Sequence, residues 1–347
     1  MAETIYARST APGRAGIAVV RISGPHAWDV VRSLTRAEVP VERRAALRRI
    51  HGKAGVLDEG LVLLFGEGRS FTGEAMAELH LHGSEAVMRA VLGEIGVMPG
   101  VRPADPGEFA RRALENDRLD LTEAEGLSAL LQAETEAQRR QAARLATGAL
   151  RERSAAWRQG LLAALAELEA AVDFADEEVP TEVSGALAGR LDELAREMRR
   201  EERGQAAAAR IAEGFEVAIV GAPNVGKSTL LNCLAGRDAA LTSEVAGTTR
   251  DIVEVRMEVH GQLVTFLDTA GIREAEDAVE RLGVERARRR AEAADLRVFL
   301  GDVPDGMTAS PEDLLVQGKA DLGVPEPGRL AVSGVTGEGI GDLVEAI

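Results

Sequence analysis

The chain has 347 residues, of which 45% are hydrophobic and 3% aromatic, and its formal net charge is −16. This length exceeds one typical domain, so we expect two or three domains. Residues 1–118 carry 16 Lys and Arg against 15 Asp and Glu, whereas residues 119–347 carry 25 against 42. The acidic body disfavours nucleic-acid binding by phosphate neutralisation alone, and the few aromatic residues disfavour a base-stacking surface.

The chain has the features of a cytoplasmic protein. No apolar run approaches the ~18 residues of a membrane span, and the N-terminus has no signal-peptide pattern. The single cysteine, Cys233, cannot form an internal disulfide. We therefore expect a cytoplasmic location and no contact with a membrane.

Three regions of different texture indicate a multidomain chain. Residues 1–118 mix strand and helix patterns and are expected to form an α+β N-terminal domain. Residues 119–213 are rich in Ala, Leu, Glu and Arg with a 3.6-residue period, which predicts an all-α helical middle domain. Residues 214–347 alternate strands with helices, which predicts an α/β domain.

Within these regions, periodicity predicts individual elements. His80 and His82 stand two residues apart on one expected strand, but no third ligand is near them in the sequence, so a metal site is not expected there. We expect strands at residues 15–22, 60–65, 75–81, 216–220 and 263–267, shorter helices at residues 26–35 and 84–95, and long helical stretches at about residues 119–172 and 183–212.

Residues 221–228, GAPNVGKS, match the phosphate-loop pattern G-x-x-x-x-G-K-S/T directly after an expected buried strand. In such a loop, backbone N–H groups surround the β-phosphate, and the lysine, here Lys227, places a positive charge on the β- and γ-oxygens. Ser228 offers a hydroxyl to Mg²⁺, and a helix expected to open at Thr229 directs its positive end toward the same anion. This stretch predicts a nucleoside triphosphate site.

A second phosphate-sensing pattern, DTAG at residues 268–271, follows the expected strand 263–267. In phosphate-loop proteins, an acid such as Asp268 reaches the Mg²⁺ shell, and the N–H of a glycine such as Gly271 can sense the γ-phosphate. Between the two patterns lie Thr248 and Thr249. A threonine on such a loop can close over Mg²⁺ when a γ-phosphate is present and leave after hydrolysis, which makes a switch.

Two further stretches favour guanine over adenine. Lys319–Ala320–Asp321 is similar to the end of the guanine motif N-K-x-D, with Gly318 where that motif has Asn. The Asp321 carboxylate can accept hydrogen bonds from N1–H and the 2-amino group of guanine, and adenine lacks both donors. Ser333–Gly334–Val335 is similar to the S-A-x loop that also contacts guanine.

The residue after the DTAG pattern is Ile272, where signalling GTPases place a water-orienting Gln. Isoleucine forms no hydrogen bond, so other groups must orient water and neutralise charge. Asn224 is a candidate ligand for a monovalent cation beside the β- and γ-oxygens, and Glu280 is a candidate to orient water through a second water.

Several motifs in a fixed order resemble the MnmE (TrmE) family of bacterial tRNA-modification GTPases over essentially the whole chain. They are APGRAGIAVVRISG at residues 11–24, SFTGE at 70–74 with Glu78 and His82–Gly83, PGEF at 106–109, NDRLDLTEAE at 116–125 and VDFADEE at 172–178, besides the phosphate-loop patterns. The resemblance implies a folate-binding and dimerising first domain (1–118), a helical domain (119–213) and a GTPase domain (214–347).

The resemblance also implies an activity and partners. The family's GTP hydrolysis is K⁺-dependent. Together with MnmG, an FAD protein, the family modifies carbon 5 of the wobble uridine in certain tRNAs. The one-carbon unit comes from 5-formyl- or 5,10-methylene-tetrahydrofolate, and the assembly is a homodimer that joins MnmG in a heterotetramer.

Family residues carry over onto matching positions of this chain. Arg21, Glu78 and Arg118 are expected to bind folate, with Arg118 standing where the family has lysine. The expected K⁺ ligands are Asn224, Ser243, Val245 and Thr248, the Mg²⁺ ligands are Ser228 and Thr249, and the catalytic residues are Glu280, Asn224, Lys227 and Thr249. The expected GTP-binding residues are Asn224, Val225, Gly226, Lys227, Ser228, Thr229, Ser243, Glu244, Val245, Ala246, Gly247, Thr248, Thr249, Asp268, Thr269, Ala270, Gly271, Lys319, Asp321, Ser333, Gly334 and Val335.

The sequence departs from the family at its C-terminus, and other functions stay open. Family chains continue with further helices and end in a C-x-G-K motif, which this sequence does not contain. The expectation is therefore either a shortened chain or a protein without the complete modification reaction. A ribosome-assembly GTPase shares the phosphate-loop patterns but is expected to carry a basic RNA-binding region. A non-catalytic remnant that binds GTP or folate is the third alternative.

Overall fold

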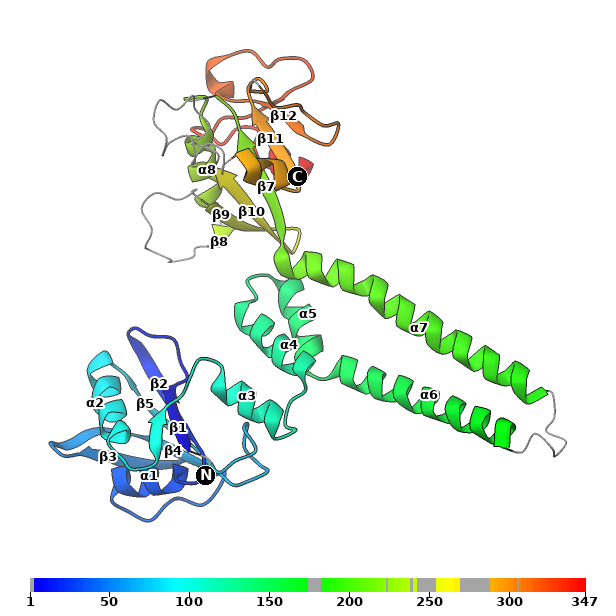
Figure 1. Ribbon diagram of the computed structural model, residues 1–347. Helices are drawn as coiled ribbons and strands as arrows, with labels where there is room; N and C mark the ends of the chain where they lie inside the picture. The colour runs from blue at the N-terminus through cyan, green and yellow to red at the C-terminus, as the bar shows by residue number, and fades with distance from the viewer. Residues whose placement is uncertain are drawn as a thin grey trace. The chain divides into compact units, whose positions relative to one another are not determined.

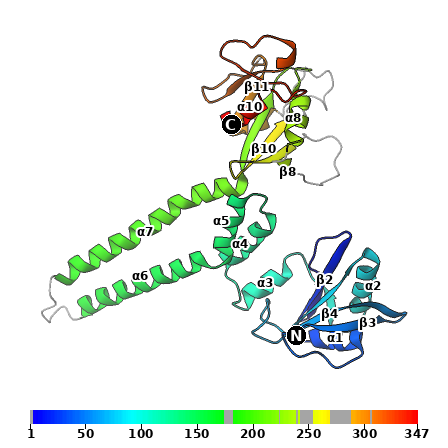
Figure 2. The ribbon, with the colours of Figure 1, turned by 180° about the vertical axis from the view of Figure 1, so that it is seen from behind.

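The computed structural model describes residues 3–173, 182–222, 224–237, 240–241, 254–268, 288–304 and 306–347. The chain divides into two compact units, residues 1–125 and residues 126–347. Figures 1 and 2 show the chain from opposite sides. Each unit is described by itself below.

The first unit is built on a six-stranded sheet in the order β3-β4-β5-β2-β1-β6. Neighbouring strands are antiparallel except β1 and β6, which are parallel. Apolar residues of α1 and α2 share one core with the strands, so both helices cover the same face of the sheet. The elements are β1 (Thr4–Arg8), β2 (Ala15–Ser23), α1 (Ala27–Thr35), β3 (Ala46–Gly52), β4 (Gly55–Phe65), β5 (Met76–Gly83), α2 (Glu85–Gly96), β6 (Val101–Pro103) and α3 (Glu108–Glu115).

The expected strands of this unit correspond to β2, β4 and β5, and the expected helices correspond to α1 and α2. Sequence periodicity does not predict β1, β3, β6 or α3. The reason is clearest in β1, where Thr4, Ile5 and Tyr6 are all buried in succession. A strand buried on both faces has no alternation of polar and apolar residues to mark it.

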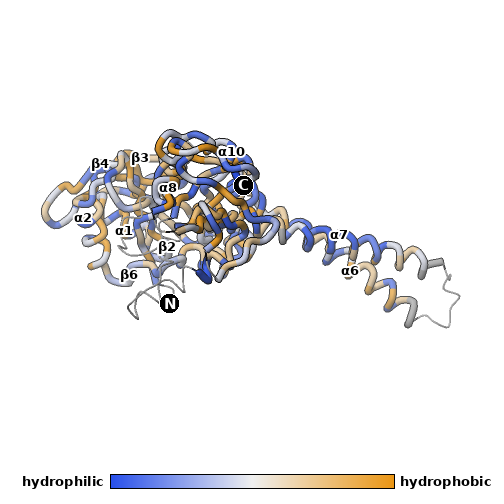
Figure 3. Tube along the Cα trace, turned by 90° about the horizontal axis from the view of Figure 1, so that it is seen from above, coloured by the Kyte–Doolittle hydropathy of each residue, from blue (hydrophilic) through white to orange (hydrophobic). Residues whose placement is uncertain are grey.

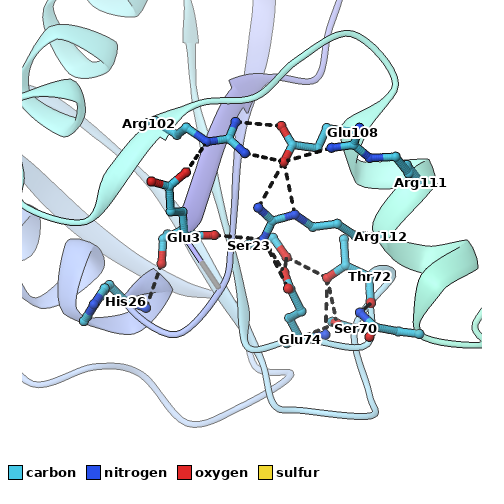
Figure 4. Close-up of polar contacts among 12 residues, drawn as sticks. Glu3, Ser23, His26, Ser70, Thr72, Glu74, Arg102, Glu108, Arg111 and Arg112 are labelled. Carbon is cyan, nitrogen blue, oxygen red and sulfur yellow. Dashed lines mark hydrogen bonds and ion pairs between the residues drawn. The ribbon is translucent and has the colours of Figure 1, made fainter. Parts of the chain in front are cut away.

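A buried ion-pair network fixes α3 against the sheet (Figure 4). Glu108, only 2% exposed, accepts hydrogen bonds from Arg102 at 2.7 and 2.8 Å and from Arg112 at 3.0 Å. Arg112 also donates to Glu74 at 3.0 Å, and Glu74 accepts a further bond from the Ser23 hydroxyl at 2.7 Å. Because every buried charge has a partner, the network links α3 and the Glu74 loop to β2 without an uncompensated charge.

Removing the charge of Glu108 is expected to destabilise the first unit. The hydrogen bond from Arg102 is the main cause that lowers the pKa of Glu108 from 4.5 to about 2. Its stabilising contribution is thus complete above the unfolded pKa and is lost as the pH falls from about 4.5 toward 2. We expect Glu108→Gln to lower the free energy of unfolding by about 2–4 kcal/mol at pH 7 and to weaken its dependence on acid.

Urea unfolding followed by Trp28 fluorescence in a Trp157→Phe background would measure this effect at pH 7, 5 and 3. Glu115→Gln is the matched control, since Glu115 lies on the same helix with its side chain 63% exposed. An acid dependence of Glu108→Gln equal to that of the unsubstituted chain would contradict the role of this carboxylate.

In the described part of the chain, four helices follow β6 and α3 before the second sheet begins. The stretch expected to be helical at residues 119–172 is broken at two places, before α5 and before α6. Thr135 starts α5 with a capping box, because its Oγ1 accepts from the N–H of Gln138 and the Gln138 amide accepts from the N–H of Thr135. Gly148, at φ +79°, separates α5 from α6. The helices are α4 (Leu121–Gln132), α5 (Glu136–Ala146), α6 (Ala149–Asp173) and α7 (Glu182–Glu213).

The two long helices, α6 and α7, lie side by side, and α7 is hydrophilic along much of its length (Figure 3). Trp157 of α6 donates its indole N–H to Glu197 of α7 at 3.2 Å, and Arg153 pairs with Glu201. Among the described residues, no helix combines the length and apolarity that a bilayer crossing requires.

A seven-stranded sheet in the order β13-β12-β11-β7-β10-β9-β8 ends the second unit. Strands β10, β7, β11, β12 and β13 are parallel, whereas β9 is antiparallel to both β10 and β8. Apolar residues of α8 and α10 pack into one core with the strands. The elements are β7 (Phe215–Val220), α8 (Lys227–Ala235), β8 (Ala240–Leu241), β9 (Glu254–Val259), β10 (Gln262–Asp268), β11 (Leu296–Leu300), β12 (Leu314–Gln317), the 3₁₀ helix η1 (Ala320–Leu322), β13 (Leu330–Ala331) and α10 (Ile340–Ala346).

This sheet confirms the expected α/β class for the last region and fixes where a ligand can bind. The loops after β7, β11 and β12 and the last residue of β10 lie at one edge, since these strands are parallel. Ligands of open α/β sheets bind at the carboxyl ends of the strands. The phosphate-loop residues therefore stand at the expected edge.

Candidate nucleotide and folate sites

The phosphate loop joins the end of β7 to the start of α8. Gly226, at φ +112°, caps the helix, and α8 begins at Lys227, two residues earlier than expected. The Lys227 side chain is 7% exposed, and its Nζ donates to the carbonyl oxygens of Gly221 at 2.6 Å and Ala222 at 2.9 Å. The loop thus holds the ammonium group beside the N-terminus of a helix, where an anion is favoured.

Asn224 has a left-handed backbone in this loop, at φ +61°. Few residues other than glycine adopt this conformation, and asparagine is among those that tolerate it best. The residue is exposed. The sequence pattern gives no sign of this backbone constraint, which bears on how Asn224 can be tested.

Asp268 and Ser228 form a site that suits Mg²⁺. The Ser228 hydroxyl donates to Asp268 Oδ2 at 3.3 Å, and the Asp268 side chain is buried. Asp268 Oδ1 is buried without a hydrogen-bond partner among the described residues. A buried carboxylate oxygen left unpaired is costly, and a hard cation with oxygen ligands would satisfy it.

The base motifs meet around a cavity of about 130 Å³. The Ser333 hydroxyl, fully buried, donates to Asp321 Oδ1 at 2.5 Å and accepts from the N–H groups of Val335 at 3.3 Å and Thr336 at 3.2 Å. This fixes the carboxylate at the cavity wall. The lining brings the expected base residues together with the phosphate loop, and comprises Val225, Gly226, Thr229, Leu230, Leu300, Gly318, Lys319, Asp321, Leu322, Val332, Ser333, Gly334 and Val335.

Part of the expected site lies outside the described residues. The switch and catalytic segments account for all of these positions. They are Ser243, Glu244, Val245, Ala246, Gly247, Thr248, Thr249, Thr269, Ala270, Gly271, Ile272 and Glu280.

In the first unit, Arg21 and Glu78 face each other across β2 and β5. Arg21 donates from Nε at 3.0 Å and from Nη2 at 2.8 Å to the same oxygen, Glu78 Oε1. Its guanidinium lies over the rings of Phe71 and Phe109, at 5.3 and 5.8 Å from the ring centres. The pair is only partly exposed, so Glu78 is an oriented carboxylate in a partly apolar setting.

Arg118, the third expected folate residue, lies against the loop that carries Phe71. A Cβ built on Gly73 of that loop would be 3.1 Å from Arg118 Cγ. The loop therefore contacts Arg21 through Phe71 and Arg118 through Gly73. It contacts both expected folate arginines.

Phe71, Phe109 and His80 contact this pair, although no role was predicted for them from the sequence. Both phenylalanines lie within motifs, SFTGE and PGEF, that were used for the family resemblance. The presence of these motifs was the sequence signal that could have pointed to them. His80 Nε2 lies 3.3 Å from Glu78 Oε2, while His82 contacts Asp58 at 2.7 Å instead. The two histidines therefore face different carboxylates.

Comparison with known proteins gives matches over both units. The family described as GTP-binding protein TrmE N-terminus matches residues 4–118, and the family described as 50S ribosome-binding GTPase matches residues 216–323. Two proteins named tRNA modification GTPase MnmE, from two strains of Cereibacter sphaeroides, are 56% and 57% identical to this chain over 99% of its length and 81% of theirs.

Among solved structures, a crystal structure of Aquifex aeolicus Era bound to GDP and AlF₄⁻ is 30% identical to this chain. The match covers 38% of this chain and 54% of that chain, with a TM-score of 0.29.

Proposed function

Because this chain belongs to the MnmE family of tRNA modification GTPases, we propose a complete reaction for it. It hydrolyses GTP in a K⁺-dependent step and, with an MnmG-type FAD protein, modifies carbon 5 of the wobble uridine of certain tRNAs. The one-carbon unit comes from 5-formyl- or 5,10-methylene-tetrahydrofolate. The observation that carries the proposal is the identity of 56–57% over 99% of this chain, which spans both the folate and the nucleotide candidates.

In the nucleotide site, this chain's own residues bind and orient GTP. Lys227 is placed to exchange its two carbonyl partners for phosphate oxygens, and Asp321 holds the base. Ser228 and Thr249 would bind Mg²⁺ with Asp268 beside them, and the ion would neutralise charge on the β- and γ-oxygens. Support comes from the unpaired, buried Asp268 Oδ1.

The monovalent cation and the attacking water are assigned to groups around the same loop. Asn224 would bind K⁺ together with Ser243, Val245 and Thr248. Glu280 would orient water, because Ile272 cannot. These five assignments rest on the positions that the residues occupy in the motifs shared with the family.

In the first domain (1–118), we assign tetrahydrofolate to the surface formed by Arg21, Glu78 and Arg118. Arg21 occupies Glu78 Oε1, whereas Oε2, with His80 Nε2 at 3.3 Å, would accept from the amino-pterin ring, and Arg118 suits the acidic glutamate tail. The same domain is proposed to form the homodimer. The helical domain (119–213) and the GTPase domain (214–347) complete a cytoplasmic assembly, a heterotetramer with the MnmG-type protein.

Two experiments test the proposal. The purified chain should hydrolyse GTP faster in KCl than in NaCl. Equal rates in the two salts would favour a different type of GTPase, and GTP binding without hydrolysis would favour a non-catalytic protein. Chain mixed with an MnmG-type protein, tetrahydrofolate substrate and tRNA should yield modified wobble uridine by mass spectrometry. Binding to 50S ribosomal subunits without any modified uridine would instead favour the ribosome-assembly function suggested by the match at residues 216–323.

Neutralising Glu78 is expected to weaken folate binding. Glu78→Gln keeps the shape but removes the charge that binds the pterin donors, so the Kd for 5-formyl-tetrahydrofolate should rise about 10- to 100-fold in isothermal titration. Glu59→Gln is the control, since Glu59 lies on β4 of the same sheet with its side chain half-exposed. Equal affinity of Glu78→Gln and the unsubstituted chain would remove Glu78 from the folate site.

A further inference from the structure

Among the described residues, none of the three atoms nearest to a Cβ built on Gly318, in the wall of the base cavity, is a hydrogen-bond donor. A Cβ built on Gly318 would be 3.0 Å from the carbonyl oxygen of Val225 and 3.2 Å from Leu300 Cδ1. A carbonyl oxygen accepts and does not donate, and the leucine carbons do neither. These nearest atoms therefore offer nothing to an acceptor atom of a bound base.

Gly334 shows that one loop of the cavity packs on α8 without room for a side chain at that position. A Cβ built on Gly334 would be 2.8 Å from the backbone of Thr229 and Leu230, in the first turn of α8. Contacts this short do not occur between real Cβ atoms and backbone, so residue 334 approaches the helix only as glycine. A Cβ on Gly318 would likewise be within 3.0 Å of the phosphate loop. The absence of a side chain at Gly318 therefore leaves no empty space in the wall.

The position of Gly318 indicates which part of a purine it faces. Gly318 lies against Val225 of the phosphate loop, whereas Asp321 stands three residues farther along the chain and is held by Ser333. In a nucleotide, the five-membered ring with N7 is joined to the ribose and so lies toward the phosphates. The six-membered ring with N1–H and the 2-amino group reaches away from them, toward Asp321.

We propose that this chain recognises guanine through Asp321 at N1 and the 2-amino group and leaves N7 without a partner, because Gly318 supplies no donor. The inference rests on the GTP site proposed above and goes beyond it in assigning Gly318 a role in specificity. Replacing N7 by a C–H group costs no hydrogen bond in this site. Removing the 2-amino group costs one that Asp321 makes.

Equilibrium titration with GDP, 7-deaza-GDP and IDP tests the assignment. In the unsubstituted chain, 7-deaza-GDP should bind within about twofold of GDP, and IDP should bind about 10- to 100-fold more weakly, the loss of one bond to a charged acceptor. Gly318→Asn introduces an amide donor, and should raise the preference for GDP over 7-deaza-GDP to about three- to tenfold.

Gly318→Ala is the matched control, since it adds the crowded Cβ without the amide. Gly318→Ala should weaken the binding of GDP and of 7-deaza-GDP equally. The ratio of the two Kd values is measured within one variant, so a general loss of affinity does not change that ratio. A preference for GDP over 7-deaza-GDP of about fivefold or more in the unsubstituted chain would overturn the inference, whether or not Gly318→Asn folds. Equal binding of IDP and GDP would overturn the Asp321 assignment, and absence of nucleotide binding would overturn the GTP site itself.

Discussion

Replacing Lys227 by methionine is expected to lower kcat for GTP hydrolysis by about 10²–10³-fold or more, the effect of removing a preorganised charge from a transition state. The Lys227 ammonium group is enclosed by the phosphate loop, bonded to the carbonyl oxygens of Gly221 and Ala222. Methionine has similar length and removes only the charge. The packing of α8 should survive, because it depends on Leu230, Leu231 and Leu234.

Two comparisons define what this result means. Lys227→Arg keeps the charge but carries a planar guanidinium, which does not fit where a compact ammonium is held by two carbonyl groups, so it should also be strongly impaired. Lys53→Met, at an exposed position of the first unit, should leave kcat unchanged. Single-turnover hydrolysis with Mg²⁺ and K⁺ measures all three. A Lys227→Met rate within tenfold of the unsubstituted chain would contradict a role for this charge in the transition state.

The phosphate-loop and base-motif elements of the candidate nucleotide site could be predicted from sequence because each is local. The phosphate loop is a continuous stretch between an apolar strand and a helix, and the structure forms both elements there. Asp321 and Ser333 are twelve residues apart, each within its own motif, and the structure joins them by a hydrogen bond. Gly318 departs from the guanine motif in a way that is visible in sequence, but its contact with Val225 needed coordinates.

The folate candidate could be predicted only in part because its contacts are long-range. Arg21 meets Glu78 across a strand pair and meets Phe71 and Phe109 from distant loops and α3. No local period marks such a cluster. Short strands such as β6 are equally hidden, since three residues form a strand only beside β1.

Buried polar contacts distinguish a structural network in the first unit from the candidate nucleotide site in the second. In the first unit, Glu108 and Arg112 hold α3 by paired charges, so losing one partner is expected to destabilise the unit. In the nucleotide site, by contrast, Asp268 Oδ1 has no hydrogen-bond partner among the described residues. A buried group left unsatisfied in this way is typical of a ligand site rather than of a structural one.

The cation proposal leads to the second large expected effect, a loss of K⁺ stimulation when Asn224 is replaced. If the Asn224 amide ligates K⁺ beside the phosphates, its removal should lower the hydrolysis rate in KCl by about 10²–10³-fold, toward the rate in NaCl. The measurement is the ratio of kcat in KCl to kcat in NaCl. GDP affinity should change little, because the loop is bound mainly through its backbone and Lys227.

The left-handed backbone of Asn224, at φ +61°, requires two variants rather than one. Asn224→Ala removes the amide but also places alanine in a conformation that it adopts at a cost, whereas Asn224→Gly removes the amide without that strain. Cation ligation predicts that both variants lose K⁺ stimulation. If Asn224→Gly kept the KCl-to-NaCl ratio of the unsubstituted chain while Asn224→Ala lost it, the loop conformation would be the requirement, and the amide would not be a K⁺ ligand.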